Sequence, residues 1–410
     1  MNVPGLDASW ILAHRALHTL GAIRPWTLEQ CQNALGEGAP VLVVATTALG
    51  DTILCTPLIE TLSTRLGRER TFFWVRQPYR SLYVDDPRLG SVFGAQGKYR
   101  GLGKARREMR LAMRLDGARD MACPTSGAPG RPPGFIALIA NCSEPDVVPW
   151  LWWCGARGFL RYRSRWSTWA PWFANRADMR MPHEKGYATG HAIANNLAMA
   201  TSLGLEPTTE RMRIDVWPRG TSPRSGTSHV PGTPNVPASP HHPSPLVLIH
   251  PGASRAEKCW PVERWAEVAQ GIVQRALASG APAPRFIVTG SGAERETAEK
   301  LRAMLPGNAV SRAGELGLRD LAVLQQGAAL FLSGDTGPYH LAVAVGCPTV
   351  SLFAPRDRGS STEACGLHKA DRARHAEIET REFGRPISEI SAEVVLAEAL
   401  RVMAALRITA

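Results

Sequence analysis

The chain has 410 residues, of which 44% are hydrophobic and 20% charged, as expected for a soluble globular protein of about two domains. Its formal net charge of +11 favours anionic partners such as nucleotides, phosphorylated glycans, nucleic acid or an acidic membrane surface, without choosing among them. The sequence contains no stretch apolar enough to cross a bilayer and no zinc-finger or RNA-binding signature. Its eight cysteines form no C-x-x-C pair, which argues against a disulfide framework and favours a reducing compartment.

Residues 1–38 predict an N-terminal helical extension, in which Trp10, Leu17 and Leu20 are among the apolar positions. Such a segment either packs on the body of the protein or lies on a membrane surface, and packing is the favoured interpretation. His14, Arg15 and His18 interrupt its apolar run, so we expect no signal peptide.

The first domain is expected to cover residues 39–217 and to begin with a buried strand at 41–45. A turn over 46–51 and a helix over 52–66 follow this strand. The turn contains Gly50, a candidate nucleotide-sugar-binding residue, and ends in Asp51. The Asp51 carboxylate is either a helix N-terminal cap or a general base.

The rest of the first domain predicts strands at 72–75 and 135–139, a helix over 149–159 and a long helix over 183–203. The stretch 87–133 is rich in Gly and Arg, and its pattern assigns no element. Six tryptophans are either core or a stacking surface for an acceptor, with core favoured; they are Trp150, Trp152, Trp153, Trp166, Trp169 and Trp172.

Residues 218–245 contain eight prolines among Ser, Thr, Gly and His, a composition typical of a linker that does not fold. The second domain is then expected over 246–410. Its predicted elements are strands at 246–249 and 286–289 and helices at 261–278, 294–305, 320–326 and 391–406, besides those of residues 329–354.

Residues 329–354 predict the central unit of the second domain: a buried strand, a polar glycine turn, a helix that Pro338 can start, and another strand. Asp335, Thr336, Gly337 and His340 lie at the carboxyl end of the first of these strands. In parallel α/β sheets that edge binds ligands, because helix N-termini offer free N–H groups there. The alternative is a capped helix start, with Asp335 or Thr336 as the cap.

The two halves therefore alternate strands and helices, and each has a polar glycine turn after its first strand. This pattern predicts an α/β protein with two Rossmann-like domains. We expect the functional site in a cleft that the domains face, because ligand pockets favour domain interfaces.

Four motifs resemble glycosyltransferase family nine, the lipopolysaccharide heptosyltransferases: Ala48-Leu49-Gly50-Asp51; Pro251-Gly252-Ala253 with Lys258-Cys259-Trp260-Pro261; Gly290 to Glu294; and Asp335-Thr336-Gly337 with His340. Their order and spacing match the family over residues 40–400, although Ala45 stands where the family often has a basic residue. The resemblance implies the GT-B architecture and the inverting transfer of heptose from ADP-heptose to a sugar hydroxyl without a metal.

Sugar transfer from a nucleotide diphosphate needs a base for the acceptor proton and positive groups for the departing phosphate. Asp51 is the candidate base, because it is the one motif carboxylate in the first half. Lys258 and the N–H groups at Thr336-Gly337 are candidates for holding the phosphate. Glu294 either contacts a ribose hydroxyl or compensates the helix dipole in the first turn of a helix. His340 contacts phosphate or packs.

The nucleotide-sugar-binding candidates are Gly50, Ser254, Lys258, Glu294, Asp335, Thr336, Gly337 and His340. No metal site is expected, because no carboxylate–histidine cluster has metal-ligand spacing, and no cofactor is expected.

The favoured function is lipopolysaccharide heptosyltransfer, with ADP-heptose or a related nucleotide sugar as donor and a lipid-linked or oligosaccharide acceptor. The protein is then expected in the cytoplasm, touching the inner face of the inner membrane peripherally, with no nucleic-acid partner. The alternatives are another GT-B nucleotide-sugar enzyme, such as an epimerase, or a non-catalytic nucleotide-sugar or glycan-binding protein. A nucleic-acid binder is supported only by the net charge.

Overall fold

The computed structural model describes residues 16, 18–19, 21, 23–95, 102–113, 134–141, 147–161, 172–174, 191–216, 244–253, 255–354, 372–380 and 386–407. The chain forms two compact units, Met1–Glu210 and Arg211–Ala410, each built on its own parallel sheet. Almost all of the segment 218–245 lies outside the described residues, as do Trp166 and Trp169. No helix in the described ranges has both the length and the apolarity needed to span a bilayer.

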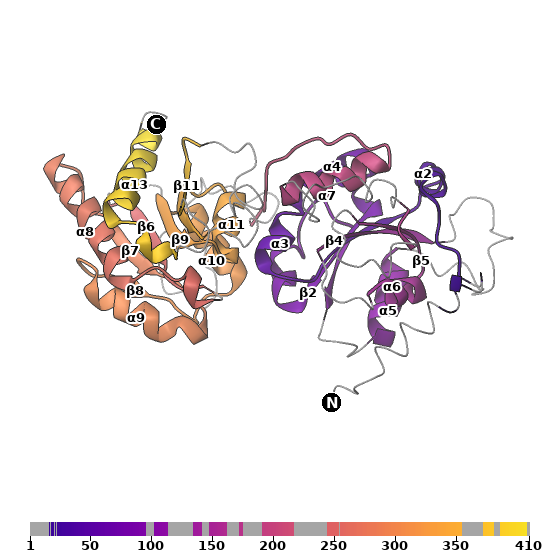
Figure 1. Ribbon diagram of the computed structural model, residues 1–410, viewed down its shortest axis with the longest axis horizontal. Coiled ribbons are helices and arrows are strands. Elements are labelled where there is room, and N and C mark those ends of the chain that lie inside the picture. Colours follow the sequence, from indigo (N-terminus) through magenta and orange to yellow (C-terminus); the bar gives the residue numbers. More distant parts are fainter. Residues whose placement is uncertain are drawn as a thin grey trace. The chain divides into compact units, whose positions relative to one another are not determined.

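Unit 1 contains a five-stranded sheet in the order β3-β2-β1-β4-β5, with every neighbouring pair parallel. Figure 1 shows α4 and α7 over one face of this sheet and α5 and α6 over the other. The strands are β1 (Val41–Ala45), β2 (Thr71–Arg76), β3 (Ser91–Ala95), β4 (Phe135–Asn141) and β5 (Ala156–Leu160). The α-helices are α2 (Leu28–Gly36), α3 (Leu49–Ile53), α4 (Thr56–Leu66), α5 (Leu102–Ala112), α6 (Val147–Cys154) and α7 (Ala192–Ser202), and the 3-10 helices are η1 (Arg68–Arg70) and η2 (Gln77–Leu82).

The apolar strand β1 is buried throughout, because helices cover both faces of the sheet around it. Trp150 and Trp172 are buried in the same core, which confirms the core interpretation for these two tryptophans. Trp152 and Trp153 are only half-buried and pack at the edge of that core.

The predicted helix over 149–159 is wrong in its second half. Helix α6 ends at Cys154, and Ala156–Leu160 forms the strand β5, in which Phe159 pairs with Ala137. Gly155 separates the two elements with a φ of 114°, a backbone conformation that favours glycine. Because the short strand β5 follows α6 after a single residue, the apolar residues of the two elements form one continuous run in the sequence, which predicted a single helix.

The helix predicted over 52–66 is two helices, α3 and α4, which break at Leu54 and Cys55. Asp51 consequently lies inside the first turn of α3 and not in the turn before the helix. The stretch 87–133, which the pattern left unassigned, contains β3 and α5.

The described part of the N-terminal extension packs on unit 1, as favoured from the sequence. The backbone N–H of Trp26 donates to the carbonyl of Arg157 over 2.8 Å, and the His18 ring stacks on Trp172 with centroids 5.4 Å apart. Gly158 in β5 leaves room for Cys31 of α2, since a Cβ there would lie 2.5 Å from the Cys31 sulfur.

Unit 2 contains a six-stranded sheet in the order β11-β10-β9-β6-β7-β8, again with every pair parallel. The strands are β6 (Leu246–His250), β7 (Arg285–Val288), β8 (Val310–Ser311), β9 (Leu330–Gly334), β10 (Thr349–Phe353) and β11 (His375–Glu379). The α-helices are α8 (Val262–Ala278), α9 (Arg295–Met304), α10 (Leu318–Gln326), α11 (Gly337–Ala344) and α13 (Ala392–Arg407), and the 3-10 helices are η5 (Ala256–Lys258), η6 (Gly292–Glu294) and η7 (Ile387–Glu389).

Both sheets are doubly wound. In unit 2 the chain lays down β6, β7 and β8 toward one edge and then returns to place β9, β10 and β11 on the other side of β6. Unit 1 reverses in the same way between β1 and β4. This confirms the α/β fold with two Rossmann-like halves, and it places the expected ligand position of each half at the reversal.

Candidate functional site

The candidate donor site of unit 2 lies where β6 and β9 end. These strands are parallel neighbours, with His250 paired to Ser333, so the residues that follow them meet at one edge of the sheet. Gly252 follows β6 and Asp335 follows β9, at the reversal of strand order where doubly wound sheets bind ligands.

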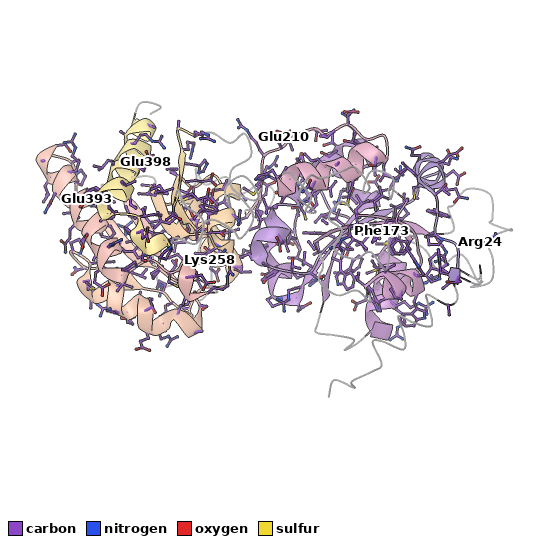
Figure 2. All side chains as sticks on the ribbon, viewed as in Figure 1. Arg24, Phe173, Glu210, Lys258, Glu393 and Glu398 are labelled. Atoms are coloured by element: carbon purple, nitrogen blue, oxygen red, sulfur yellow. The ribbon has the colours of Figure 1, made fainter. Side chains whose placement is uncertain are left out.

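Lys258 and Asp335 form an ion pair at this edge. Lys258 ends the short helix η5 and is labelled in Figure 2; its Nζ lies 2.5 Å from Oδ2 of Asp335. The Asp335 side chain is 7% exposed and that of Lys258 is 17% exposed, so the pair is largely shielded from water. Asp335 is fixed further by its backbone N–H, which donates to the carbonyl of Leu352 over 2.9 Å.

The N-terminus of α11 adjoins this pair. Thr336 precedes the helix in an extended conformation and makes no side-chain capping bond, and Pro338 lies in the first turn as predicted. The Thr336 hydroxyl oxygen is buried and has no hydrogen-bond partner among the residues that the structure describes. Because the first N–H groups of a helix lack partners within it, the hydroxyl and the N–H of Gly337 can both donate to an anion.

His340 lies one turn into α11 and is 4% exposed. Its ring lies 5.0 Å from that of Tyr339, whose hydroxyl donates to Oε1 of Glu377 over 2.5 Å. This burial favours the packing alternative for His340 over a direct contact with phosphate.

Glu294 follows β7 and closes the turn that begins α9. Its Oε2 accepts from the backbone N–H of Ser291 over 2.6 Å, which is the helix-start role predicted as one alternative. Its Oε1 lies against Gly252, where a Cβ would come within 2.1 Å. Glycine at 252 therefore lets the carboxylate approach the backbone after β6, so the ribose alternative stays open. Ser254, the other candidate in this turn, lies outside the described residues.

His250 lies beneath the Glu294 turn, at the end of β6. It is buried, and its Nδ1 is 3.2 Å from the hydroxyl oxygen of Thr289. Burial lowers the pKa of His250, and the nearby charge of Glu294 only partly opposes this shift. The lowered pKa favours the neutral form of His250.

In unit 1, Asp51 is the third residue of α3, and Gly50 beside it is buried. Oδ2 of Asp51 accepts hydrogen bonds from the Thr47 hydroxyl and from the backbone N–H of Ala48, the latter over 3.2 Å. The capping alternative is therefore realised. Both contacts use the same oxygen, so the geometry is also compatible with Oδ1 as a proton acceptor.

Buried side chains from distant parts of the sequence fix the segment that carries Asp51. The hydroxyls of Thr52 and Tyr83 lie 3.0 Å apart, and the Asn196 amide donates to the carbonyl of Leu54 over 3.1 Å at the α3–α4 break. The reasoning from sequence missed Thr47, Tyr83 and Asn196. The Thr47-x-x-x-Asp51 spacing could have indicated the first contact, whereas nothing in the sequence indicates the other two.

Among the described residues, no three His, Cys, Asp or Glu side chains are arranged to hold a metal ion. The positive groups placed at the donor site are Lys258 and the N-terminus of α11.

The model of glycosyltransferase family 9 (heptosyltransferase) matches residues 181–388, just over half of the chain. The lipopolysaccharide core heptosyltransferase OpsX of Haemophilus influenzae is 32% identical over 147 residues, which cover 35% of this chain and 40% of OpsX. Lipopolysaccharide heptosyltransferase 1 of Pseudomonas aeruginosa is 38% identical over 114 residues, covering 28% and 30% of the two chains. The matched segments thus span less than half of these relatives.

Solved structures share the fold over most of the chain. A family 9 glycosyltransferase from Veillonella parvula superposes with a TM-score of 0.63 and 17% identity, covering 89% of this chain and 97% of its own. The ADP-heptose lipopolysaccharide heptosyltransferase II of E. coli gives a TM-score of 0.60 and 16% identity, covering 90% and 100%. The fold is therefore GT-B. Since the family model matches more than half of the residues of this chain, the chain belongs to glycosyltransferase family 9, the heptosyltransferases.

Proposed function

We propose that this glycosyltransferase is an inverting, metal-independent heptosyltransferase that moves heptose from ADP-heptose to a hydroxyl of a lipopolysaccharide core acceptor. The observation that carries the proposal is the shielded Lys258–Asp335 pair beside the unpartnered Thr336 hydroxyl at the start of α11. Its family and the names of its relatives support this donor and acceptor class.

On the donor side, the departing ADP gains negative charge on its diphosphate. Asp335 holds the Lys258 ammonium in place through one hydrogen bond, which leaves two N–H groups for phosphate oxygens. The Thr336 hydroxyl and the Gly337 N–H add two further donors at the positive end of α11. These groups supply the positive charge that the reaction needs, so the proposal requires no metal. Glu294 would accept from a ribose hydroxyl.

On the acceptor side, the hydroxyl oxygen forms a bond to the anomeric carbon while the bond from that carbon to the phosphate oxygen breaks. The proton passes to Asp51, and ADP leaves with the bonding electrons. Attack on the face opposite the leaving group inverts the configuration at the anomeric carbon. Thr47 and Ala48 would keep Oδ2 of Asp51 in place and leave Oδ1 for the proton.

The proposal assigns the protein to the cytoplasm, in peripheral contact with the inner membrane where a lipid-linked acceptor is anchored. It includes no nucleic-acid partner, and an oligosaccharide acceptor that lacks the lipid remains a substrate of the same chemistry.

A donor screen tests the proposal. The melting temperature of the purified protein is measured with ADP-, UDP- and GDP-sugars. In a separate assay, nucleotide release from each sugar is measured with and without a lipopolysaccharide core acceptor. We expect ADP-heptose to raise the melting temperature most and ADP release to require the acceptor. Stabilisation by a UDP- or GDP-sugar alone would overturn the donor assignment, whereas donor binding without turnover on any core acceptor would indicate a binding protein.

A further inference from the structure

A row of polar residues crosses four strands of the unit 2 sheet close to the donor site. His250 of β6 pairs with Ser333 of β9, which pairs with Ser351 of β10. Ser351 pairs in turn with Glu377 of β11. Paired residues of neighbouring parallel strands project from the same face of a sheet, so the four side chains share one face. These four residues are the polar row.

The polar row lies on the side of the sheet that α11 covers. Glu377 accepts a hydrogen bond from the hydroxyl of Tyr339, in the first turn of α11. Val350 and Leu352, the neighbours of Ser351 in β10, project from the other face and belong to the apolar core of unit 2. The polar row is therefore next to the helix whose N-terminus contributes to the donor site.

Ser333 and Ser351 are both fully buried. A buried hydroxyl costs free energy unless it has a hydrogen-bond partner. Both hydroxyls have the same partner, because the carbonyl of Gly334 accepts from Ser333 over 3.1 Å and from Ser351 over 3.0 Å. A carbonyl oxygen has two lone pairs and can accept both bonds. Of the two serines, Ser351 is the one that ties β10 to β9, since Ser333 precedes Gly334 in the same strand.

The Gly334 carbonyl belongs to the same planar peptide group as the N–H of Asp335. That N–H donates to the carbonyl of Leu352 over 2.9 Å. Two hydrogen bonds to β10, one from the Ser351 side chain and one to the backbone, thus hold the peptide group that carries Asp335. Because the Asp335 carboxylate binds the Lys258 ammonium, the orientation of this peptide group determines where the ammonium lies.

Gly334 also contacts the segment that carries Lys258. A Cβ at position 334 would lie 3.0 Å from the backbone carbonyl oxygen of Lys258, a closer approach than most Cβ atoms make. Glycine at this position therefore lets η5 lie against the end of β9. Lys258 is held at both ends, by its backbone against Gly334 and by its ammonium on Asp335.

We propose that Ser351 is a positioning residue of the donor site: its hydroxyl fixes the Gly334–Asp335 peptide group and, through it, the Lys258 ammonium. Ser351 is fully buried and so does not touch the donor itself. A cation that is held in place before the diphosphate arrives loses less freedom when it binds, which favours binding. The inference rests on the proposed donor site and adds to it a residue outside the four sequence motifs.

Calorimetric titration of the full chain with ADP tests this role. Ser351→Ala removes the hydroxyl and leaves the four motifs intact. Its matched control, Thr349→Val, removes another buried hydroxyl from the same face of β10. The Thr349 hydroxyl lies at the start of the strand, 3.0 Å from Nδ1 of His375, and not at the carboxyl edge where the donor site is. Melting curves measure how far each change destabilises the fold.

We expect Ser351→Ala to bind ADP roughly 2- to 10-fold more weakly, the value of one hydrogen bond. Thr349→Val should bind ADP as the wild type does, although both changes lower the melting temperature. A double-mutant cycle with Lys258→Ala tests whether Ser351 acts through the ammonium. In the Lys258→Ala background, adding Ser351→Ala should change ADP affinity by less than about twofold, because the group that Ser351 positions is already absent.

Gly334→Ala replaces Ser351→Ala if the latter does not fold. It leaves both serine hydroxyls in place, but its methyl group would displace the backbone of Lys258. ADP binding should again weaken, and only when Lys258 is present.

Three results would overturn the proposal and leave the donor site in place. They are wild-type ADP affinity in Ser351→Ala, an equal loss of affinity in Thr349→Val, and effects of Ser351→Ala and Lys258→Ala that add. If the wild type bound no ADP, the donor assignment and this proposal would fail together, so the two failures are distinguishable.

Discussion

At the scale of single residues, the Lys258–Asp335 pair places a positive charge in the proposed donor site. The sequence predicted both residues as site residues but not that they pair, because 77 residues separate them and only the return of β9 to the side of β6 brings them together. The pairing matters energetically, since a shielded carboxylate that loses its cation repels the phosphates it helped to hold.

Lys258→Ala should therefore weaken ADP binding by about 1.5–3 kcal/mol, or roughly 10- to 150-fold, as for a lost charge-assisted hydrogen bond. Calorimetric titration with ADP measures this. Lys300→Ala is the matched control, because Lys300 pairs with Glu263 at 2.6 Å on an exposed surface of the same unit. Equal ADP affinity in wild type and Lys258→Ala would remove Lys258 from the site.

The capping contacts of Asp51 show how far sequence reasoning reached at this scale. Asp51 was predicted at the end of the turn before a helix, as a cap or a base, and the structure shows that it caps from the third position of α3. The contacts of Tyr83 with Thr52 and of Asn196 with the Leu54 carbonyl were not predictable, because hydrogen bonds from buried side chains to groups distant in sequence leave no local pattern.

At the scale of elements, the strands with a continuous apolar run were predicted, whereas β3 and β5 in unit 1 were not. The apolar runs of β1, β6 and β9 stood out because strands buried on both faces are continuously hydrophobic. The strands β8 and β11 were missed. The first has only two residues, and the second, at the edge of the sheet, mixes His and Glu with apolar residues.

The turn after β6 depends on the absence of a side chain at Gly252. In Gly252→Ala the added methyl group would lie 2.1 Å from Oε1 of Glu294, so the flexible carboxylate must move. If Glu294 binds the ribose, ADP affinity should fall by roughly 2- to 10-fold, the value of one hydrogen bond, with little change in melting temperature.

Gly292→Ala is the matched control for Gly252→Ala, because its added methyl group would meet nothing within 4 Å. Titration with ADP compares the two variants. Unchanged affinity in Gly252→Ala would leave Glu294 with its helix-start role alone.

At the scale of the whole molecule, the sequence predicted two α/β halves because each half repeats the same alternation of strands and helices around a polar turn. Strand order within each sheet was not readable from local pattern, although the family resemblance implied it. Whether Asp51 acts together with the donor site could likewise not be predicted from local pattern. It is tested by the rate of heptose transfer.

Each unit has its own sheet and its own buried core, so we expect two transitions in scanning calorimetry. ADP should raise only the transition of unit 2. At 100 times its dissociation constant, ADP should stabilise that unit by about 2.7 kcal/mol. An equal shift of both transitions, or a shift confined to unit 1, would contradict the assignment of the donor site to unit 2.

The rate of heptose transfer by Asp51→Asn tests the central claim most directly. The amide oxygen of Asn can still accept from Thr47 and from the N–H of Ala48, as Oδ2 of Asp51 does, but Asn accepts no proton at neutral pH. Asp320→Asn is the matched control, because Asp320 occupies the same capping position in α10 and accepts from the N–H of Gly317 over 3.3 Å. With Asp51 as the base, Asp51→Asn should bind ADP within a few-fold of wild type and turn over roughly 10²–10⁴ times more slowly, while Asp320→Asn stays active. A folded Asp51→Asn enzyme that transfers heptose at a near wild-type rate would contradict the proposed mechanism.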